Sequence, residues 1–122
     1  MNTEIKKVVQ IEELFADESR EQAIFELNGK QLVLWVKKEL PWKVIGKCIE
    51  KSYQFDKQGN WTFSIGTYVE EVLLQKIISM ENGVPVFKTH LDKLGKEWGD
   101  LIQKRLVPPP MTSEVIDEAK KE

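Results

Sequence analysis

Apolar and polar residues alternate most clearly over residues 22–27, where every second side chain is apolar. The dipeptide Asn28-Gly29 follows, and both residues tolerate the positive φ angles of a two-residue hairpin turn. Residues 31–37 then return as a second apolar stretch. The pattern therefore predicts an antiparallel β-hairpin near the start of the fold.

The returning strand of this hairpin is apolar on both faces. Leu32, Leu34 and Val36 share one face, whereas Val33 and Trp35 point to the other. Such a strand is either covered on both sides or presents an apolar face to a partner. Before the hairpin, residues 5–15 are ambiguous between a strand and a short helical turn.

Three helices are predicted after the hairpin. The first begins near Leu40, because Pro41 presets the φ angle of a first helical position. The second has Thr67 or Ser64 as its cap and ends at Asn82-Gly83. The third is capped by Thr89. Their apolar positions recur at helical spacing: Trp42, Ile45, Ile49 and Tyr53; Ile65, Val69, Val72, Leu73, Ile77 and Met80; Leu91, Leu94, Trp98, Leu101 and Ile102.

Three shorter features complete the expected fold. Residues 53–55 and 61–63 can pair across a turn whose tip is Gly59-Asn60. Gly95 and Gly99 weaken the third helix, so we expect that helix to pack closely against another backbone. The triple proline at 108–110 ends the domain. We therefore expect one α+β domain over residues 1–110, an N-terminal β-hairpin or small antiparallel sheet followed by a three-helix body, and a polar, disordered tail over 111–122.

Composition fits this view. With 122 residues, 41% apolar and 31% charged, the chain can bury a core without disulfides or metal. Its net charge of -2 gives no general attraction for nucleic acid or an anionic membrane. Cys48 is the single cysteine, which is typical of a reducing compartment. The sequence shows neither a signal peptide nor a membrane-spanning run, so we expect a soluble protein of the cytoplasm.

Catalytic and metal chemistry is poorly represented. His90 is the single histidine, and its place near a helix start favours a surface or capping role. Nothing in the sequence brings it to Cys48 or adds an orienting residue, so Cys48 is interpreted as a buried structural cysteine. One histidine and one cysteine give no metal-ligand spacing, and no glycine-rich phosphate loop is present. We expect no enzyme and no cofactor.

A stripe of lysines is the best case for nucleic acid. Lys43, Lys47 and Lys51 lie on one face of the first helix. A solvated helix face is the more common explanation, and arginines, which usually read DNA bases, are absent from the stripe. Nucleic-acid binding therefore stays an alternative.

From the hairpin to the prolines, the order of these segments resembles the tail assembly chaperones of long-tailed, siphovirus-type bacteriophages and prophages. Pro41 departs from the family, where a capping serine or threonine is more typical. The resemblance covers residues 20–110, and these segments carry it: Leu40–Lys43, Phe55–Phe63, Tyr68–Leu73, Leu94–Ile102 and Leu106–Pro109.

The resemblance implies a protein that binds and shields the tape measure protein until tail-tube subunits polymerise around it. It implies residence in the host cytoplasm, absence from the finished virion and no catalytic residues. Helical stripes of the client would pack into grooves between the chaperone's helices. The alternatives are a nucleic-acid-binding or regulatory phage protein, and a minor structural component such as a head–tail connector.

Four residues are the candidate partner contacts, namely Val33, Trp35, Trp42 and Trp98. Tryptophan is enriched in interfaces, although burial in the core explains each of these residues equally well. Self-association through the two-faced strand is also expected, and contacts with tail-tube subunits are an additional possibility.

Overall fold

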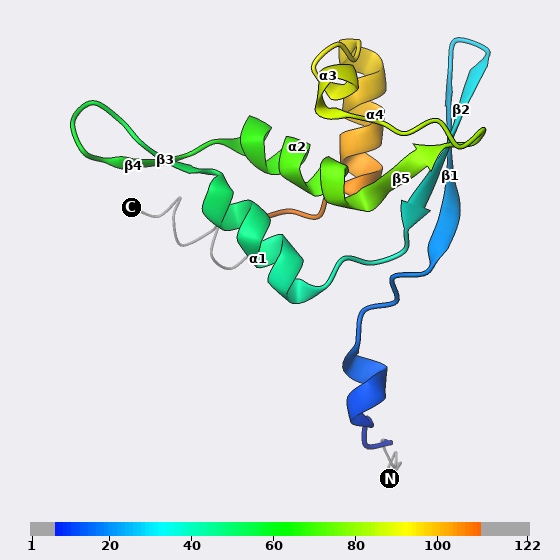
Figure 1. Cartoon of the computed structure of the whole chain (residues 1–122), viewed down its shortest axis with the longest axis horizontal. Coiled ribbons are helices and arrows are strands. Elements are labelled where there is room, and N and C mark those ends of the chain that lie inside the picture. The colour runs from blue at the N-terminus through cyan, green and yellow to red at the C-terminus, as the bar shows by residue number, and fades with distance from the viewer. Residues whose placement is uncertain (1–6, 111–122) are drawn as a thin grey trace, which may run out of the picture.

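A computed structural model describes residues 7–110 of the chain. It is an α+β structure with antiparallel sheets and four α-helices among the described residues, preceded by a short 3-10 helix (Figure 1). The predicted tail over 111–122 lies outside the described residues. The elements in chain order are η1 (Ile11–Leu14), β1 (Arg20–Leu27), β2 (Lys30–Lys37), α1 (Trp42–Lys51), β3 (Tyr53–Phe55), β4 (Trp61–Phe63), α2 (Ile65–Lys76), β5 (Ile77–Met80), α3 (Lys88–Leu91) and α4 (Lys96–Leu106).

The predicted N-terminal hairpin is confirmed. β1 and β2 pair in an antiparallel register that runs from Arg20 opposite Lys37 to Leu27 opposite Lys30. Asn28 and Gly29 form the turn with φ angles of 52° and 75°, so both occupy the left-handed region that such a turn requires. Two further hydrogen bonds extend this pairing toward the N-terminus, from Lys38 N–H to the Ser19 carbonyl and from Glu39 N–H to the Asp17 carbonyl.

The prediction that the second helix continues to Asn82-Gly83 is wrong. α2 ends at Lys76, and Ile77–Met80 form β5, which pairs antiparallel with β2 and gives the strand order β1-β2-β5. The free edge of β2 offers backbone partners that a helix would leave unused, and the β-branched Ile77 and Ile78 fit a strand well. Tertiary pairing has therefore overridden the helical spacing of this segment.

The first of two apolar cores lies on one face of the three-stranded sheet. α4 and the end of α2 cover this face. Eight buried residues form this core: Ala23, Phe25, Leu34, Val36, Leu73, Ile77, Ile102 and Leu106. The inward side chains of β1 and β2 are the alternate residues that the sequence pattern predicted.

The second core lies between α1 and α2. Its buried residues are Cys48, Tyr68 and Val72, and Ile45, Ile49, Phe63 and others pack around them. α1 begins at Trp42 with Pro41 as its cap residue. α2 begins after Ser64, whose Oγ accepts a hydrogen bond from Thr67 N–H at 3.2 Å, so Ser64 rather than Thr67 is the cap.

The expected three-helix body is corrected to four helices, because the predicted third helix is two. α3 ends at Leu91, and α4 starts after Gly95, which is its cap residue in an extended conformation. A Cβ atom added at Gly95 or Gly99 would meet nothing within 4 Å, so the close packing expected at these glycines is also wrong. Gly95 instead marks the break between the two helices.

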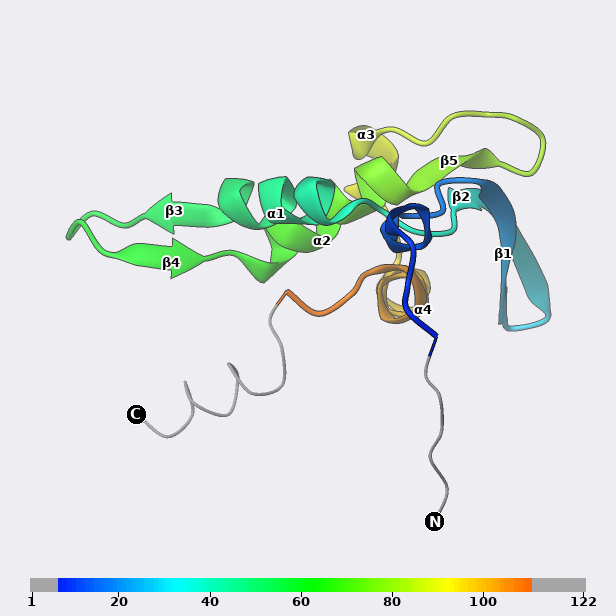
Figure 2. The ribbon, with the colours of Figure 1, turned by 90° about the horizontal axis from the view of Figure 1, so that it is seen from below.

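The elements follow the long axis of the molecule. α1 and α2 lie side by side in the middle, and β3 with β4 projects beyond them at one end (Figure 2). The three-stranded sheet lies at the opposite end, with α4 on one side of it. η1 and residues 7–10 before it extend away from the body (Figure 1).

Candidate protein-binding surfaces

Val33 and Trp35 lie together on the sheet face opposite the first core. Their side chains alternate with the buried Leu34 and Val36, as the sequence predicted, and both are half-buried. The Arg20 guanidinium lies 4.5 Å from the centroid of the Trp35 ring and covers part of it. This face is thus partly shielded by a cation that stacks on the tryptophan.

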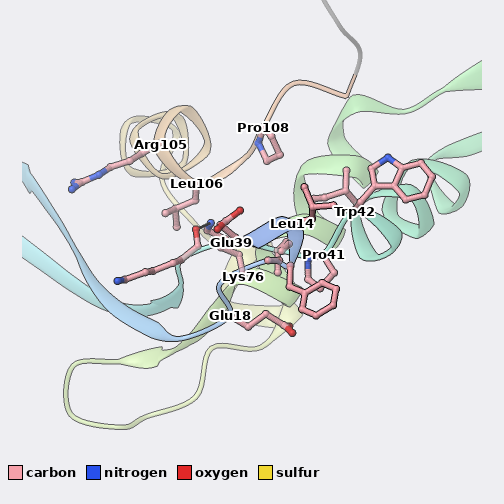
Figure 3. Close-up of a pocket in the computed structure, with 14 residues that line it drawn as sticks. Leu14, Glu18, Glu39, Pro41, Trp42, Lys76, Arg105, Leu106 and Pro108 are labelled. Carbon is pink, nitrogen blue, oxygen red and sulfur yellow. Dashed lines mark hydrogen bonds between the residues drawn. The ribbon is translucent and has the colours of Figure 1, made fainter. Parts of the chain in front are cut away.

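Trp42 is far more exposed than any other tryptophan. Its side chain retains 92% of its accessible surface at the start of α1. It lines a groove of about 990 Å³ between η1, the start of α1 and the end of α4. Figure 3 shows Pro41 and Trp42 from the start of α1, Leu14 from η1, and Leu106 and Pro108 from the end of α4 around this groove.

Charged side chains lie at the floor and rim of the groove. Lys76 Nζ donates a hydrogen bond to the Lys38 carbonyl at 2.7 Å, and burial lowers the pKa of Lys76, against the opposing effect of nearby Glu21 and Glu39. Arg105 donates to the Ile24 carbonyl at the edge of the sheet. Glu18 and Glu39 line the groove as well, so it combines apolar walls with charges of both signs.

Trp98 lies apart from the other candidates. It is half-buried on α4 and packs against the first core. Its place agrees with the core interpretation that the sequence left open. The structure therefore brings Val33 and Trp35 together and leaves Trp42 and Trp98 on separate parts of the molecule.

The hairpin formed by β3 and β4 carries a surface that the sequence reasoning did not select. Tyr53 pairs with Phe63 and Phe55 pairs with Trp61, so all four aromatic side chains share one face. The opposite face carries the polar pair of Gln54 and Thr62. We call the aromatic face of this hairpin the aromatic ribbon.

The outer part of the aromatic ribbon is open to solvent. Phe55 and Trp61 retain 61% and 62% of their accessible surface, and their ring centroids lie 3.8 Å apart. Toward the body, Tyr53 makes edge contacts with Trp61 at 6.3 Å and with Phe63 at 5.2 Å. Phe63 then meets the fully buried Tyr68 at 6.0 Å, so the ribbon is continuous with the second core.

Hydrogen bonds hold the ribbon at both ends. At its base, Ser64 N–H donates to the Ser52 carbonyl at 2.7 Å. At its tip, the Asp56 carboxylate accepts from the N–H groups of Gln58 and Asn60 at 2.9 and 2.8 Å, and Gly59 has a φ of 81°. The sequence contained the signal for this surface, because aromatic residues alternate symmetrically on both sides of the predicted turn. The predicted pairing of residues 53–55 with 61–63 already places these rings on one face, although Tyr53 also fits the apolar stripe of the first helix.

Cys48 and His90 lie in separate parts of the structure. Cys48 is buried between α1 and α2, where burial and the nearby Glu71 raise its pKa despite the opposing effect of Lys51. His90 Nδ1 accepts a hydrogen bond from Phe87 N–H at 3.0 Å, which is the capping role that the sequence predicted. No group of three or more potential metal ligands occurs within residues 7–110.

The lysine stripe is exposed along α1. Lys51 Nζ lies 3.5 Å from a carboxylate oxygen of Glu71, whose side chain is half-buried. Within the described part of the chain, Lys43 and Lys47 have no ion-pair partner. These positions fit a solvated helix face.

No family model, curated protein or solved structure matches this chain. None of the helices within residues 7–110 has the length and apolar character needed to cross a membrane.

Proposed function

We propose that this protein is an assembly chaperone of a long-tailed bacteriophage. It binds the tape measure protein in the host cytoplasm and shields its apolar helical surfaces before tail-tube subunits replace it. The order of sequence segments over residues 20–110 supports this family assignment. The observation that carries the binding function is the aromatic ribbon, which holds a large apolar surface in solvent.

The ribbon is suited to docking rather than to folding. A two-stranded hairpin is marginally stable alone, and an apolar face normally packs against a further layer. Here Phe55 and Trp61 lie beyond the helices, so their rings contribute little to either core. Aromatic side chains of this kind supply much of the energy of protein–protein contacts. The apolar stripe of a client helix would cover them.

Shallow binding agrees with the need for release. The exposed rings form a flat face instead of a deep pocket, and Gln54 and Thr62 keep the reverse side polar. A contact of this size falls below the roughly 1,200 Å² that stable complexes bury. Several chaperone copies can therefore cover one long client, while each copy remains easy to displace.

Co-expression with the tape measure protein tests the proposal. We expect the long client to stay soluble and to co-purify with the chaperone. A chain with Phe55→Thr and Trp61→Thr is expected to lose co-purification by about tenfold or more, because it removes two exposed anchors. Threonine keeps strand propensity, so the hairpin itself should persist.

Phe87→Thr is the matched control, since Phe87 is similarly exposed at 58% but lies away from the ribbon. This variant should behave as the wild type. Trp35→Ala, Trp42→Ala and Trp98→Ala rank the original candidates in the same assay. A client that is equally insoluble with and without this chain would exclude the chaperone proposal.

The lysine stripe supports a second candidate function, namely binding of nucleic acid. Binding of labelled oligonucleotides should then weaken steeply as salt concentration rises. It should also depend on Lys43 and Lys47. Finding the chain in purified virions would instead favour a structural component.

A further inference from the structure

An apolar arm precedes the first strand. We define the arm as residues 8–15, which include η1. It extends away from the body (Figure 1) and contacts neither core. Five of its side chains are large, apolar and exposed, namely Val8, Val9, Ile11, Leu14 and Phe15, and Val8 retains 84% of its accessible surface.

The arm leaves the body beside the groove that Trp42 lines. Asp17 and Ser19 are hydrogen-bonded to the residues that follow β2, and the Lys38 ammonium lies 3.8 Å from the Asp17 carboxylate. This pairing fixes the root of the arm. Leu14 and Phe15 consequently form part of the groove wall, while residues 8–11 project past it. Arm and groove are thus one continuous apolar surface.

We propose that two copies of this chain associate by placing each arm in the groove of the other. A two-fold axis satisfies both contacts at once, because every copy carries one arm and one groove side by side. Association therefore stops at a dimer, because both arms and both grooves are then occupied. It uses surfaces separate from the aromatic ribbon, so it stands independently of the proposed client binding.

The available area matches such a dimer. From the 150–250 Å² of a large aromatic side chain, Trp42 and Phe15 together expose on the order of 300 Å². The four aliphatic arm residues bring the apolar surface of each copy to roughly 700 Å². A standard interface buries about 800 Å² on each partner. The exposed rings of the aromatic ribbon offer less apolar surface.

Charge favours the same pairing. The arm carries Glu12 and Glu13 among its apolar residues, whereas Lys38, Lys76 and Arg105 line the groove. Two carboxylates, Glu18 and Glu39, also line the groove, so its lining holds three cations and two anions. Groups of both signs have contacts within their own chain, and Lys38 is among them through Asp17. Glu18 lies 3.5 Å from Lys37 Nζ, and Glu39 accepts a hydrogen bond from Asp17 N–H at 3.2 Å. An acidic arm entering a groove with this small excess of positive charge is therefore complementary.

Sedimentation equilibrium of the full chain, without any client, tests this dimer. We expect a monomer–dimer equilibrium whose affinity falls as salt concentration rises. Ile11→Ser in the arm and Trp42→Ala in the groove should each raise the dimer Kd by about tenfold or more. Glu12→Lys should weaken the dimer as well, whereas Glu26→Lys on β1 and Phe87→Thr should leave it unchanged.

Both apolar variants alter highly exposed side chains, so their melting curves should show a folded protein. A chain that is monomeric at every concentration would overturn the proposal. The proposal would also be overturned if only one of Ile11→Ser and Trp42→Ala weakened the dimer, because the arm and the groove form the same contact. A monomer in which both variants lower thermal stability would show instead that the arm folds into its own groove. Loss of client binding in Trp42→Ala, with no dimer in the wild type, would assign the groove to the client.

Discussion

The two cores of this protein use their large apolar residues differently. The core under the sheet buries eight residues from three strands and two helices, and its aromatic residue Phe25 is 5% exposed. The core between α1 and α2 buries three residues, while Trp42, Phe55 and Trp61 on the adjoining elements remain in solvent. Apolar side chains in the first region are used to fold the chain. In the second region most of the large ones are available to bind.

This difference shows that a count of tryptophans says little about core size. Trp98 is half-buried and packs against the first core, whereas Trp42 contributes to neither core. Substitution of an exposed ring near the second core should change the stability of the fold little but should weaken binding to a partner. Substitution of a buried residue in the sheet core should instead lower the stability of the fold.

The largest contrast is expected between two phenylalanines. Phe25→Ala removes a ring packed in the sheet core and should lower the free energy of unfolding by about 3–5 kcal/mol. Phe55→Ala removes an exposed ring and should lower it by about 1 kcal/mol, which is the value of its contact with Trp61. Urea denaturation of both variants measures the difference. Equal losses would show that the ribbon is part of the folding core.

A smaller effect is expected at the buried tyrosine that links the ribbon to the second core. The Tyr68 hydroxyl donates a hydrogen bond to the Pro108 carbonyl at 2.8 Å. Tyr68→Phe keeps the ring and removes this bond, so stability should fall by about 1 kcal/mol. Thermal or chemical denaturation gives the value. An unchanged stability would mean that the bond contributes nothing to holding the segment after α4.

The smallest effect concerns pH and again separates the two cores. Burial raises the pKa values of Cys48 and Tyr68 above the ordinary values of a thiol and a phenol. In the folded chain both groups keep a proton that the unfolded chain has already lost. The stability that they contribute is therefore complete below the pKa values of the unfolded chain and is lost as pH rises through the folded pKa values.

Denaturation curves recorded between pH 8 and about 10 should reveal this decline. Cys48→Ala should make the fall of stability with pH less steep at the start of that range. Phe25→Ala should leave this slope unchanged, because neither Cys48 nor Tyr68 lies in the sheet core. A slope that Cys48→Ala leaves unchanged would contradict the assignment.

The hairpins are the part of the fold that the sequence predicted best. Asn28-Gly29 and Gly59-Asn60 force local turns, and both pairs of strands follow directly from the residues beside them. β5 and the break before α4 could not be predicted in this way. β5 exists because the edge of β2 is available, and that edge is contributed by residues more than forty positions earlier.

The candidate surfaces were predicted less completely. Alternation along residues 31–37 correctly placed Val33 and Trp35 on one face of the sheet. Trp42 was placed on the same stripe as Ile45, yet helix packing buries one side of α1 around Cys48 and leaves Trp42 in the groove. The arm could not be recognised from sequence, because its exposure depends on where the groove lies.

α2 has a consequence for how any partner would be detected. Its neighbouring residues Val72 and Leu73 belong to different cores, so the helix cannot unfold without disturbing both. Binding that stabilises one end of the molecule therefore stabilises the whole cooperative unit. A single melting transition, followed while candidate peptides are added, would thus report occupancy of the ribbon or of the groove without a label at either.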